Sequence, residues 1–149
     1  MINLFKRFGF ALLLSHAFNA TAQLHEHNVW YEKDAVLYNV TQRADGSPVM
    51  ISISQAGFEN ANLTISYIST GKCPAKPIPL EVDRRQIPSR YVCSQQGPEK
   101  IEHFLVGDAG CVNALVKKIN TDGFILLQKD INVLASNIRA PRYGMGSPF

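Results

Sequence analysis

The segments Ala35-Val-Leu-Tyr-Asn-Val-Thr-Gln42 and Pro48-Val-Met-Ile-Ser-Ile-Ser-Gln55, joined through Asp45-Gly46, decide the fold of this chain. In each segment apolar residues recur at every second position, a period typical of β-strands because side chains two residues apart share one face. Asp-Gly between two such segments is a strong signal for a tight hairpin turn. We therefore predict an antiparallel hairpin from residues 35–42 and 48–55.

The alternation continues on the C-terminal side of the hairpin. Leu63, Ile65 and Tyr67 alternate with polar residues, which predicts a third strand and an antiparallel meander. Around a turn at Asp83–Ser89 and beyond it, shorter strands are expected at Leu80–Asp83, Tyr91–Ser94, Ile101–Val106 and Phe124–Leu127. Residues 131–138 fit either a strand or a helix, and the preceding Lys129-Asp130 favours a hairpin.

One segment has the period of a helix. Apolar residues recur at helical spacing from Cys111 to Ile119, and the pair Lys117-Lys118 falls on the other side. Asp108 is a good N-cap because its carboxylate accepts hydrogen bonds from free amides of the first turn. Gly123, just beyond the pattern, suits a helix end. These features predict one main helix near residues 108–120.

Together these segments predict an α+β fold, in which a mostly antiparallel sheet of about six to eight short strands carries one packed helix. Three prolines in residues 71–79 exclude regular structure there and indicate a surface loop or a sheet edge. Residues 23–140 are long enough to form one domain with its own core. The Gly- and Pro-rich residues 141–149 are expected to form a flexible tail.

Residues 1–22 have the organisation of a secretory signal peptide. Lys6 and Arg7 precede the apolar run Phe8–Leu14, and Ala20-Thr21-Ala22 has the small-x-small pattern that signal peptidase cleaves. The run is too short for a membrane-spanning helix. Its short basic and apolar regions are typical of bacteria. The mature chain is therefore expected to start at Gln23 and to work in the periplasm or outside the cell.

The composition argues against a nucleic-acid partner and against a membrane-spanning segment in the mature chain. Lys6 and Arg7 are two of the 15 basic residues of the precursor, so the mature chain has 13 basic residues against 12 acidic ones. A nucleic-acid-binding face needs clustered basic residues, and the pairs Arg84-Arg85 and Lys117-Lys118 are too short to form one. No second apolar run reaches membrane-spanning length. We expect no nucleic-acid partner and no membrane span in the mature chain.

Three cysteines in an exported chain predict one disulfide and one remaining thiol. Cys73–Cys93 is the favoured pair because both residues lie in or beside expected loops, although the sequence leaves pairings with Cys111 open. Cys111 lies on the apolar stripe of the helix, where a buried, inert thiol is expected. A redox role is disfavoured because the chain contains no Cys-x-x-Cys.

Catalytic motifs are missing from the sequence, which contains no Gly-x-Ser-x-Gly, no His-Glu-x-x-His and no phosphate-binding glycine loop. An exported enzyme built on Cys111, His103 and Asp108 is an alternative, because the first turn of a helix lowers a thiol pKa and His103 precedes that helix. Nothing in the sequence supplies an orienting third residue or an oxyanion loop. We expect no enzymatic activity and no cofactor.

The expected mature N-terminus offers a second alternative. In Gln23-Leu24-His25, the free amine, two backbone amides and the third-position imidazole could bind Cu(II) or Ni(II) in a square plane, with His27 nearby. An N-terminal glutamine tends to cyclise, which removes the amine. A flexible polar lead is therefore the preferred interpretation of both histidines.

A small exported domain without catalytic residues is most often a binding module. We hypothesise that it binds another protein in the cell envelope or a secreted effector, as an inhibitor, an immunity-type protein or an accessory of envelope assembly. An exposed sheet edge could pair with an extended partner segment. Candidate contact residues in the Pro-rich loop and the tail are Pro74, Pro77, Pro79, Arg142 and Tyr143. Trp30 is expected to anchor the first strand to the core.

Overall fold

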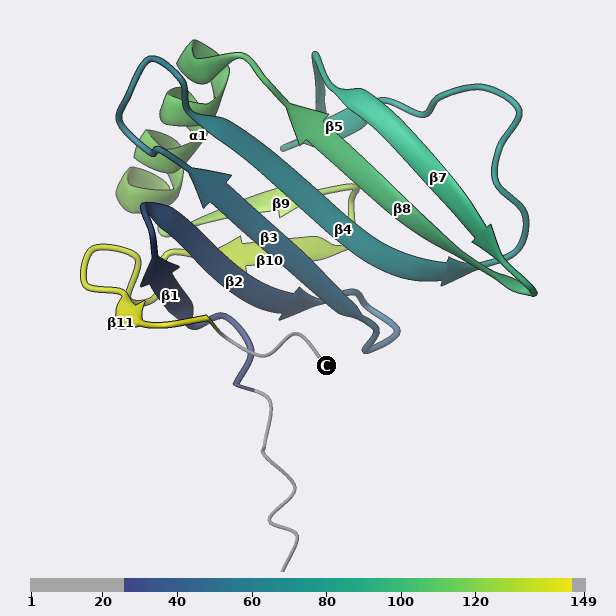
Figure 1. Cartoon of the computed structure of the whole chain (residues 1–149), viewed down its shortest axis with the longest axis horizontal. Helices are drawn as coiled ribbons and strands as arrows, with labels where there is room; N and C mark the ends of the chain where they lie inside the picture. Colours follow the sequence, from purple (N-terminus) through teal and green to yellow (C-terminus); the bar gives the residue numbers. More distant parts are fainter. Residues whose placement is uncertain (1–25, 146–149) are drawn as a thin grey trace, which may run out of the picture.

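A computed structural model describes residues 26–145 and shows two β-sheets and one helix (Figure 1). The strands are β1 (Trp30–Lys33), β2 (Val36–Gln42), β3 (Pro48–Ser54), β4 (Asn62–Thr70), β5 (Leu80–Val82), β6 (Arg85–Ile87), β7 (Arg90–Gln96), β8 (Glu99–Val106), β9 (Phe124–Leu127), β10 (Ile131–Leu134) and β11 (Arg142–Tyr143), and the helix is α1 (Ala109–Asp122). The larger sheet has the order β11-β1-β2-β3-β4-β8-β7, and the smaller one β10-β9-β5-β6. The predicted α+β class is confirmed.

The predicted hairpin is confirmed as β2 and β3. Asn39 pairs with Ile51 and Thr41 with Val49 in an antiparallel register. Gly46 occupies the turn with φ +84°, a left-handed conformation that glycine adopts without steric cost. β4 continues the meander, and its partner on the other side is β8, which comes later in the chain.

The apolar core lies between the two sheets and beside the helix. In Figure 1 the smaller sheet lies behind the larger one, and α1 stands at one end of both. Fully buried side chains come from both sheets and include Ile51, Ile65 and Phe104 of the larger sheet and Leu80, Leu127 and Ile131 of the smaller one. The described residues therefore share one hydrophobic core.

The helix begins and ends where the sequence predicts. The Asp108 side chain accepts a hydrogen bond from the backbone N–H of Cys111, and Gly123 ends the helix in the left-handed conformation. The side chains of Val112, Leu115 and Ile119 form the buried face of the helix. Within residues 26–145, no helix is both long and apolar enough to cross a membrane.

Three features differ from the sequence-based expectations. The strands are divided between two sheets, and β6 occupies part of the expected turn at Asp83–Ser89. In contrast, the hairpin favoured for the ambiguous residues 131–138 is confirmed, because they begin with β10, which pairs antiparallel with β9. Arg142 and Tyr143, assigned to a flexible tail, form β11 and pair parallel to β1. Short strands of two or three residues carry too little periodicity to be found in a sequence.

The favoured disulfide, Cys73–Cys93, is present. Its Cα atoms lie 5.8 Å apart, and it joins the Pro-rich loop 71–79 to the middle of β7. A second link comes from the side chain of Gln95, which accepts a hydrogen bond from the backbone N–H of Cys73 at 2.9 Å and donates one to Gly71 O. The disulfide therefore holds a loop that has no strand partner.

Removal of the disulfide is expected to destabilise the protein measurably. In the double variant Cys73→Ser/Cys93→Ser the unfolded chain regains the freedom of a loop with a sequence separation of 20, which costs about 3 kcal/mol of unfolding free energy. Urea denaturation of both proteins measures this loss. Cys111→Ser is the control, because it removes a thiol without removing a cross-link. An unchanged midpoint in the double variant would contradict the prediction.

Candidate functional site

The outward face of the larger sheet, opposite to the core, is apolar at its centre. One row across five strands consists of Val40, Met50, Ser66, His103 and Val92. In the neighbouring row Ile68 pairs with Ile101. No described strand or helix lies over this face (Figure 1). Antiparallel sheets with one solvated face normally carry polar side chains there, so this apolar centre is unusual.

A shallow hollow of about 220 Å³ lies in this face, lined largely by Val40, Met50, Ile68 and Ile101, together with His103. The His103 Nδ1 atom lies 2.7 Å from the hydroxyl oxygen of Ser66, its neighbour across β4 and β8. This hydrogen bond fixes the imidazole among apolar side chains. We call this region the outer hollow.

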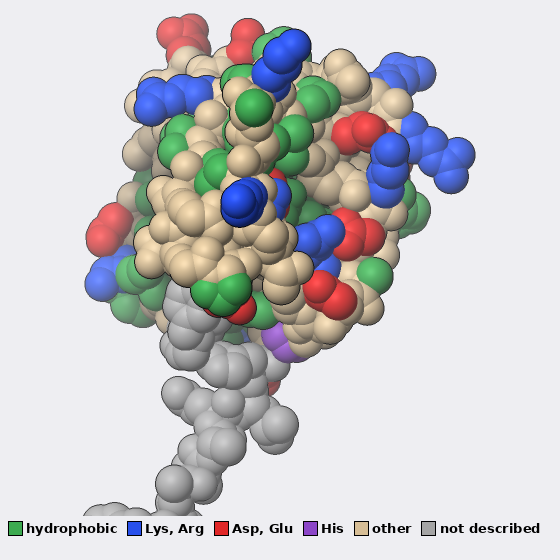
Figure 2. All heavy atoms as spheres, turned by 90° about the vertical axis from the view of Figure 1, so that its right-hand side faces the viewer, with side chains coloured by type: hydrophobic (Ala, Val, Ile, Leu, Met, Phe, Trp, Pro, Cys, Tyr) green, Lys and Arg blue, Asp and Glu red, His purple; other side chains and the backbone are tan. Residues whose placement is uncertain are grey.

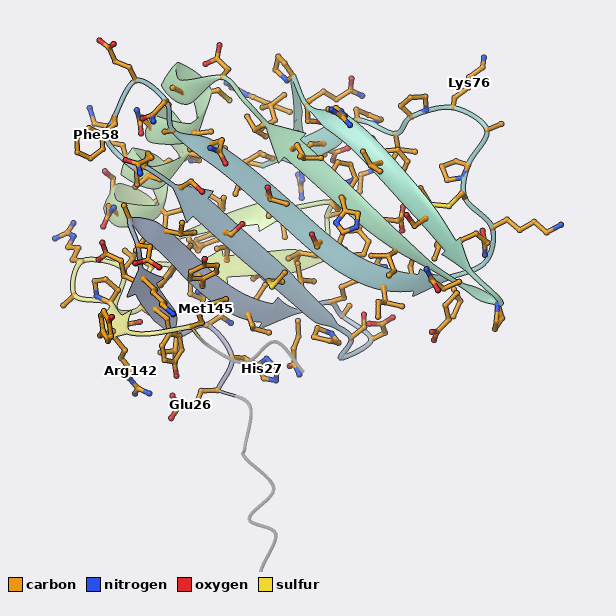
Figure 3. The ribbon with its side chains drawn as sticks, in the orientation of Figure 1. Glu26, His27, Phe58, Lys76, Arg142 and Met145 are labelled. Atoms are coloured by element: carbon orange, nitrogen blue, oxygen red, sulfur yellow. A yellow bond between two sulfur atoms is a disulfide. The ribbon has the colours of Figure 1, made fainter. Side chains whose placement is uncertain are left out.

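The Pro-rich loop and its candidate residues lie at one edge of the larger sheet. Pro74, Pro77 and Pro79 are all exposed. Their loop is linked to β7, the last strand in the sheet order, through Cys73–Cys93. Figure 3 shows Lys76 on the same loop, pointing away from the sheets.

Arg142 and Tyr143 lie at the opposite edge, in β11. Tyr143 is 89% exposed, and the Arg142 guanidinium lies 6.0 Å from the centroid of the Tyr31 ring. Arg142 also forms an ion pair with Glu26, and Figure 3 shows the two side chains close together. Since β11 and β7 are the two ends of one sheet, the structure does not bring the two sets of candidate contact residues together.

A polar cleft of about 700 Å³ opens between the sheets, at the end away from α1. Sequence reasoning missed this cleft. The Arg43 guanidinium lies 5.0 Å from the centroid of the Tyr67 ring, and its Nε donates to Asp130 at 3.0 Å. Glu99, Lys100 and Glu102 line another part of the wall. Figure 2 shows basic and acidic side chains intermixed over this end of the molecule.

Glu102 is the buried charge of the cleft, with 4% of its surface exposed. It accepts hydrogen bonds from the hydroxyl groups of Tyr91, at 2.7 Å, and of Ser69, and the ammonium of Lys100 lies 3.4 Å away. Burial alone raises the pKa of Glu102, but the hydrogen bonds from Ser69 and Tyr91 and the Lys100 charge outweigh it and hold the pKa below 4.5. Glu102 is therefore an anion at neutral pH.

The tyrosines of the cleft keep their protons at neutral pH. Burial, together with the negative charge of Glu102, raises the pKa of Tyr67 to about 12. Burial and the hydrogen bond to Glu102 also raise the pKa of Tyr91. General acid–base catalysis favours a group whose pKa lies near the working pH. These shifts move the pKa values of Glu102 and of both tyrosines further from pH 7. Such shifts are typical of a structural network rather than of catalytic groups.

The residues of the alternative thiol site, Cys111 and His103, lie on different sides of the larger sheet. Cys111 packs against the core, whereas His103 belongs to the outward row and is hydrogen-bonded to Ser66. Burial, and then the charge of Asp108, raise the pKa of the Cys111 thiol. The Asp108 carboxylate accepts from the N–H of Cys111 at 2.7 Å, as a helix cap. A nucleophilic cysteine needs a lowered pKa, which this position does not provide.

The candidate metal ligands are only partly within the described residues. His25 lies outside them, as do the signal peptide and the expected mature N-terminus. The His27 Nε2 atom lies 2.8 Å from the side-chain nitrogen of Gln42 at the end of β2. Among residues 26–145, no group of three or more His, Cys, Asp or Glu side chains is placed to hold a metal ion.

Comparison with known protein families, curated proteins and solved structures found no match. The outer hollow has a signal in the sequence, because Met50, Ile68 and Ile101 are apolar residues at positions where a solvated face would carry polar ones.

Proposed function

We propose that this protein is a small exported, non-enzymatic binding module that contacts another protein of the cell envelope, or a secreted effector, through the outward face of its larger sheet. The observation that carries the proposal is the outer hollow. Apolar surface that remains accessible marks interaction sites in soluble proteins, and the half-buried Met50, Ile68 and Ile101 provide it on a rigid sheet, beside the buried Val40.

Two further features support this proposal. The charged cleft holds Glu102, Tyr67 and Tyr91 in protonation states that do not change near neutral pH. The disulfide Cys73–Cys93 fits an oxidising compartment such as the periplasm, and the features of residues 1–22 are the basis for export. The role in the envelope, as inhibitor, immunity-type protein or assembly accessory, depends on the identity of the partner.

The substitution Ile101→Glu is expected to weaken partner binding at least tenfold. An unpaired carboxylate buried against an apolar partner costs more than the roughly 1.4 kcal/mol that a tenfold change represents. The tagged protein would first be isolated from the envelope fraction of its host, its N-terminus determined and co-purifying proteins identified by mass spectrometry. The dissociation constant of the purified partner would then be measured for wild type and variant.

Phe58→Glu is the matched control. Phe58 is also an exposed apolar residue, 63% accessible, but it lies in the turn between β3 and β4 rather than in the outer hollow. The proposal requires Phe58→Glu to bind as wild type does. A monomer without a partner, or a partner whose affinity ignores Ile101→Glu, would overturn it.

A further inference from the structure

β7 is an open edge of the larger sheet. It pairs with β8 through all seven of its residues, Arg90–Gln96, and no strand lies on its other side in the sheet order. In an antiparallel pair alternate backbone N–H and C=O groups point away from the partner strand. Among the described residues, no backbone hydrogen bond outside the strand ladders involves residues 90–96. These outward groups are therefore available to another strand.

The Pro-rich loop leaves this edge free. Its links to β7 run through the side chains of Cys93 and Gln95. In the strand register Cys93 is opposite the buried Glu102, so this link is on the core side of the sheet. The loop is thus attached to the core-side face of β7 and does not pair with the backbone of this strand.

The segments that flank this edge are basic. Five exposed cations lie between residues 71 and 98 and form no ion pair within the described part of the chain: Lys72, Lys76, Arg84, Arg85 and Arg90. The two acidic residues of this segment, Glu81 and Asp83, are paired with Lys129 and Lys118. The loop tied to β7 and the segment that leads into this strand therefore carry a net positive charge.

We infer that β7 binds an extended acidic segment of the partner protein as an added strand. This inference rests on the proposed function, of which it names the binding mode and the partner's chemistry. The partner backbone pairs with the outward groups of β7, and its apolar side chains continue the row of Val92 and His103 on the outward face. Its acidic side chains alternate with them and point to the other face, where the basic loop 71–79 is tied to Cys93 and Gln95. In this arrangement the partner contacts both the β7 edge and the outward face that contains the outer hollow.

The charge also favours a partner over a second copy of this chain. Antiparallel pairing of two β7 edges would place two sets of five cations around one interface, and like charges across an interface disfavour association. The other open edges are shorter, since β10 has four residues, β6 has three and β11 has two. β7 is thus the edge on which an added strand gains most hydrogen bonds.

The test uses a defined probe, a fluorescein-labelled ten-residue peptide of alternating valine and glutamate, and its counterpart of alternating valine and lysine. Binding to the full mature protein is measured by fluorescence polarisation at low and high salt, and amide hydrogen exchange locates the bound strand. We expect the glutamate peptide to bind more tightly, to weaken with salt and to slow exchange in residues 90–96. Lys72→Glu, next to the disulfide-bonded Cys73, should weaken it about fivefold, the effect of about 1 kcal/mol at an exposed charge.

Lys33→Glu is the matched control, because Lys33 is an exposed cation of β1, near the other edge of the same sheet. It should leave peptide binding unchanged. Equal binding of both peptides, unchanged exchange in β7, or a β7-mediated dimer in sedimentation velocity would overturn the inference. If binding of an envelope partner is lost in Ile101→Glu but kept in Lys72→Glu, the inference is overturned while the proposed function stands.

Discussion

The substitution Trp30→Ala is expected to lower the free energy of unfolding by about 4 kcal/mol, because it removes the largest buried side chain and leaves a cavity that the two sheets cannot close. Trp30 is 0% exposed. Its indole Nε1 donates to Leu134 O at 2.9 Å, at the end of β10 in the smaller sheet. The side chain therefore connects β1, near one edge of the larger sheet, to the opposing sheet.

A second set of bonds makes this position a junction. The backbone N–H of Trp30 donates to the Asn137 side-chain oxygen at 2.8 Å, and the Asn137 amide donates to Trp30 O at 2.9 Å. The Asn137 side chain thus bonds both backbone groups of Trp30, as a neighbouring strand would, and links β1 to the segment after β10. The cavity left by Trp30→Ala is expected to loosen this end of the sandwich before the rest of the core unfolds.

Urea denaturation followed by circular dichroism measures the effect, since Trp30 is the only tryptophan and its fluorescence is lost in the variant. Phe58→Ala is the control, because an exposed aromatic side chain should contribute less than about 0.5 kcal/mol. Trp30→Phe should fall between wild type and Trp30→Ala, since it fills part of the space but removes the indole N–H. A loss below about 1 kcal/mol for Trp30→Ala would show that the core does not depend on this contact.

The elements predicted from the sequence are those whose signals are local. The hairpin of β2 and β3 depends on strand alternation and on Asp45-Gly46, and α1 depends on its cap residues, Asp108 and Gly123. The disulfide Cys73–Cys93 is predicted because both cysteines lie in or beside expected loops, and the structure contains it. The residues that determine each of these features lie within about twenty positions of one another in the chain.

The division into two sheets depends on long-range contacts, which alternation cannot reveal. β2 illustrates the difficulty, because its polar residues Asn39 and Thr41 face the core whereas Tyr38 and Val40 belong to the outward face. The Thr41 hydroxyl is satisfied by Asn132 O in β10, at 2.7 Å. In such a strand the polar side chains can face the core, because a second sheet supplies their hydrogen-bond partners. The alternation alone therefore does not show which set of side chains faces inward.

The candidate site was predicted only in part for the same reason. The sheet edge and the Pro-rich loop were recognisable, but the outer hollow and the cleft form from side chains on strands far apart in the chain. Glu102 lies in a segment, Ile101–Val106, that was predicted as a strand, yet nothing local distinguishes it from a solvated glutamate. Its burial follows from Ser69 and Tyr91, which reach it from the strands on either side.

The substitution Glu102→Ala is expected to lower the free energy of unfolding by about 4 kcal/mol at pH 7. Removal of one member of a buried charged network leaves its partners without compensation. The ammonium of Lys100 and the hydroxyl of Tyr91 both lose their acceptor, and neither has another partner among the described residues. Glu102→Gln is expected to have a smaller effect, because the amide oxygen can still accept from a hydroxyl group.

The effect of Glu102 should also depend on pH. Because the folded protein holds the pKa of Glu102 below 4.5, ionisation stabilises the folded state at pH values above about 4.5, and this contribution is lost as the pH falls through the folded-state pKa. Unfolding free energies of wild type and Glu102→Gln should therefore converge as the solution is acidified from pH 7 towards pH 2. Glu59→Gln, an exposed change in the turn after β3, is the control for the loss of a carboxylate elsewhere on the protein. A difference between wild type and Glu102→Gln that stays constant over this range would mean that the carboxylate charge does not stabilise the fold, and that its hydrogen bonds alone hold β4, β8 and β7 together at the cleft.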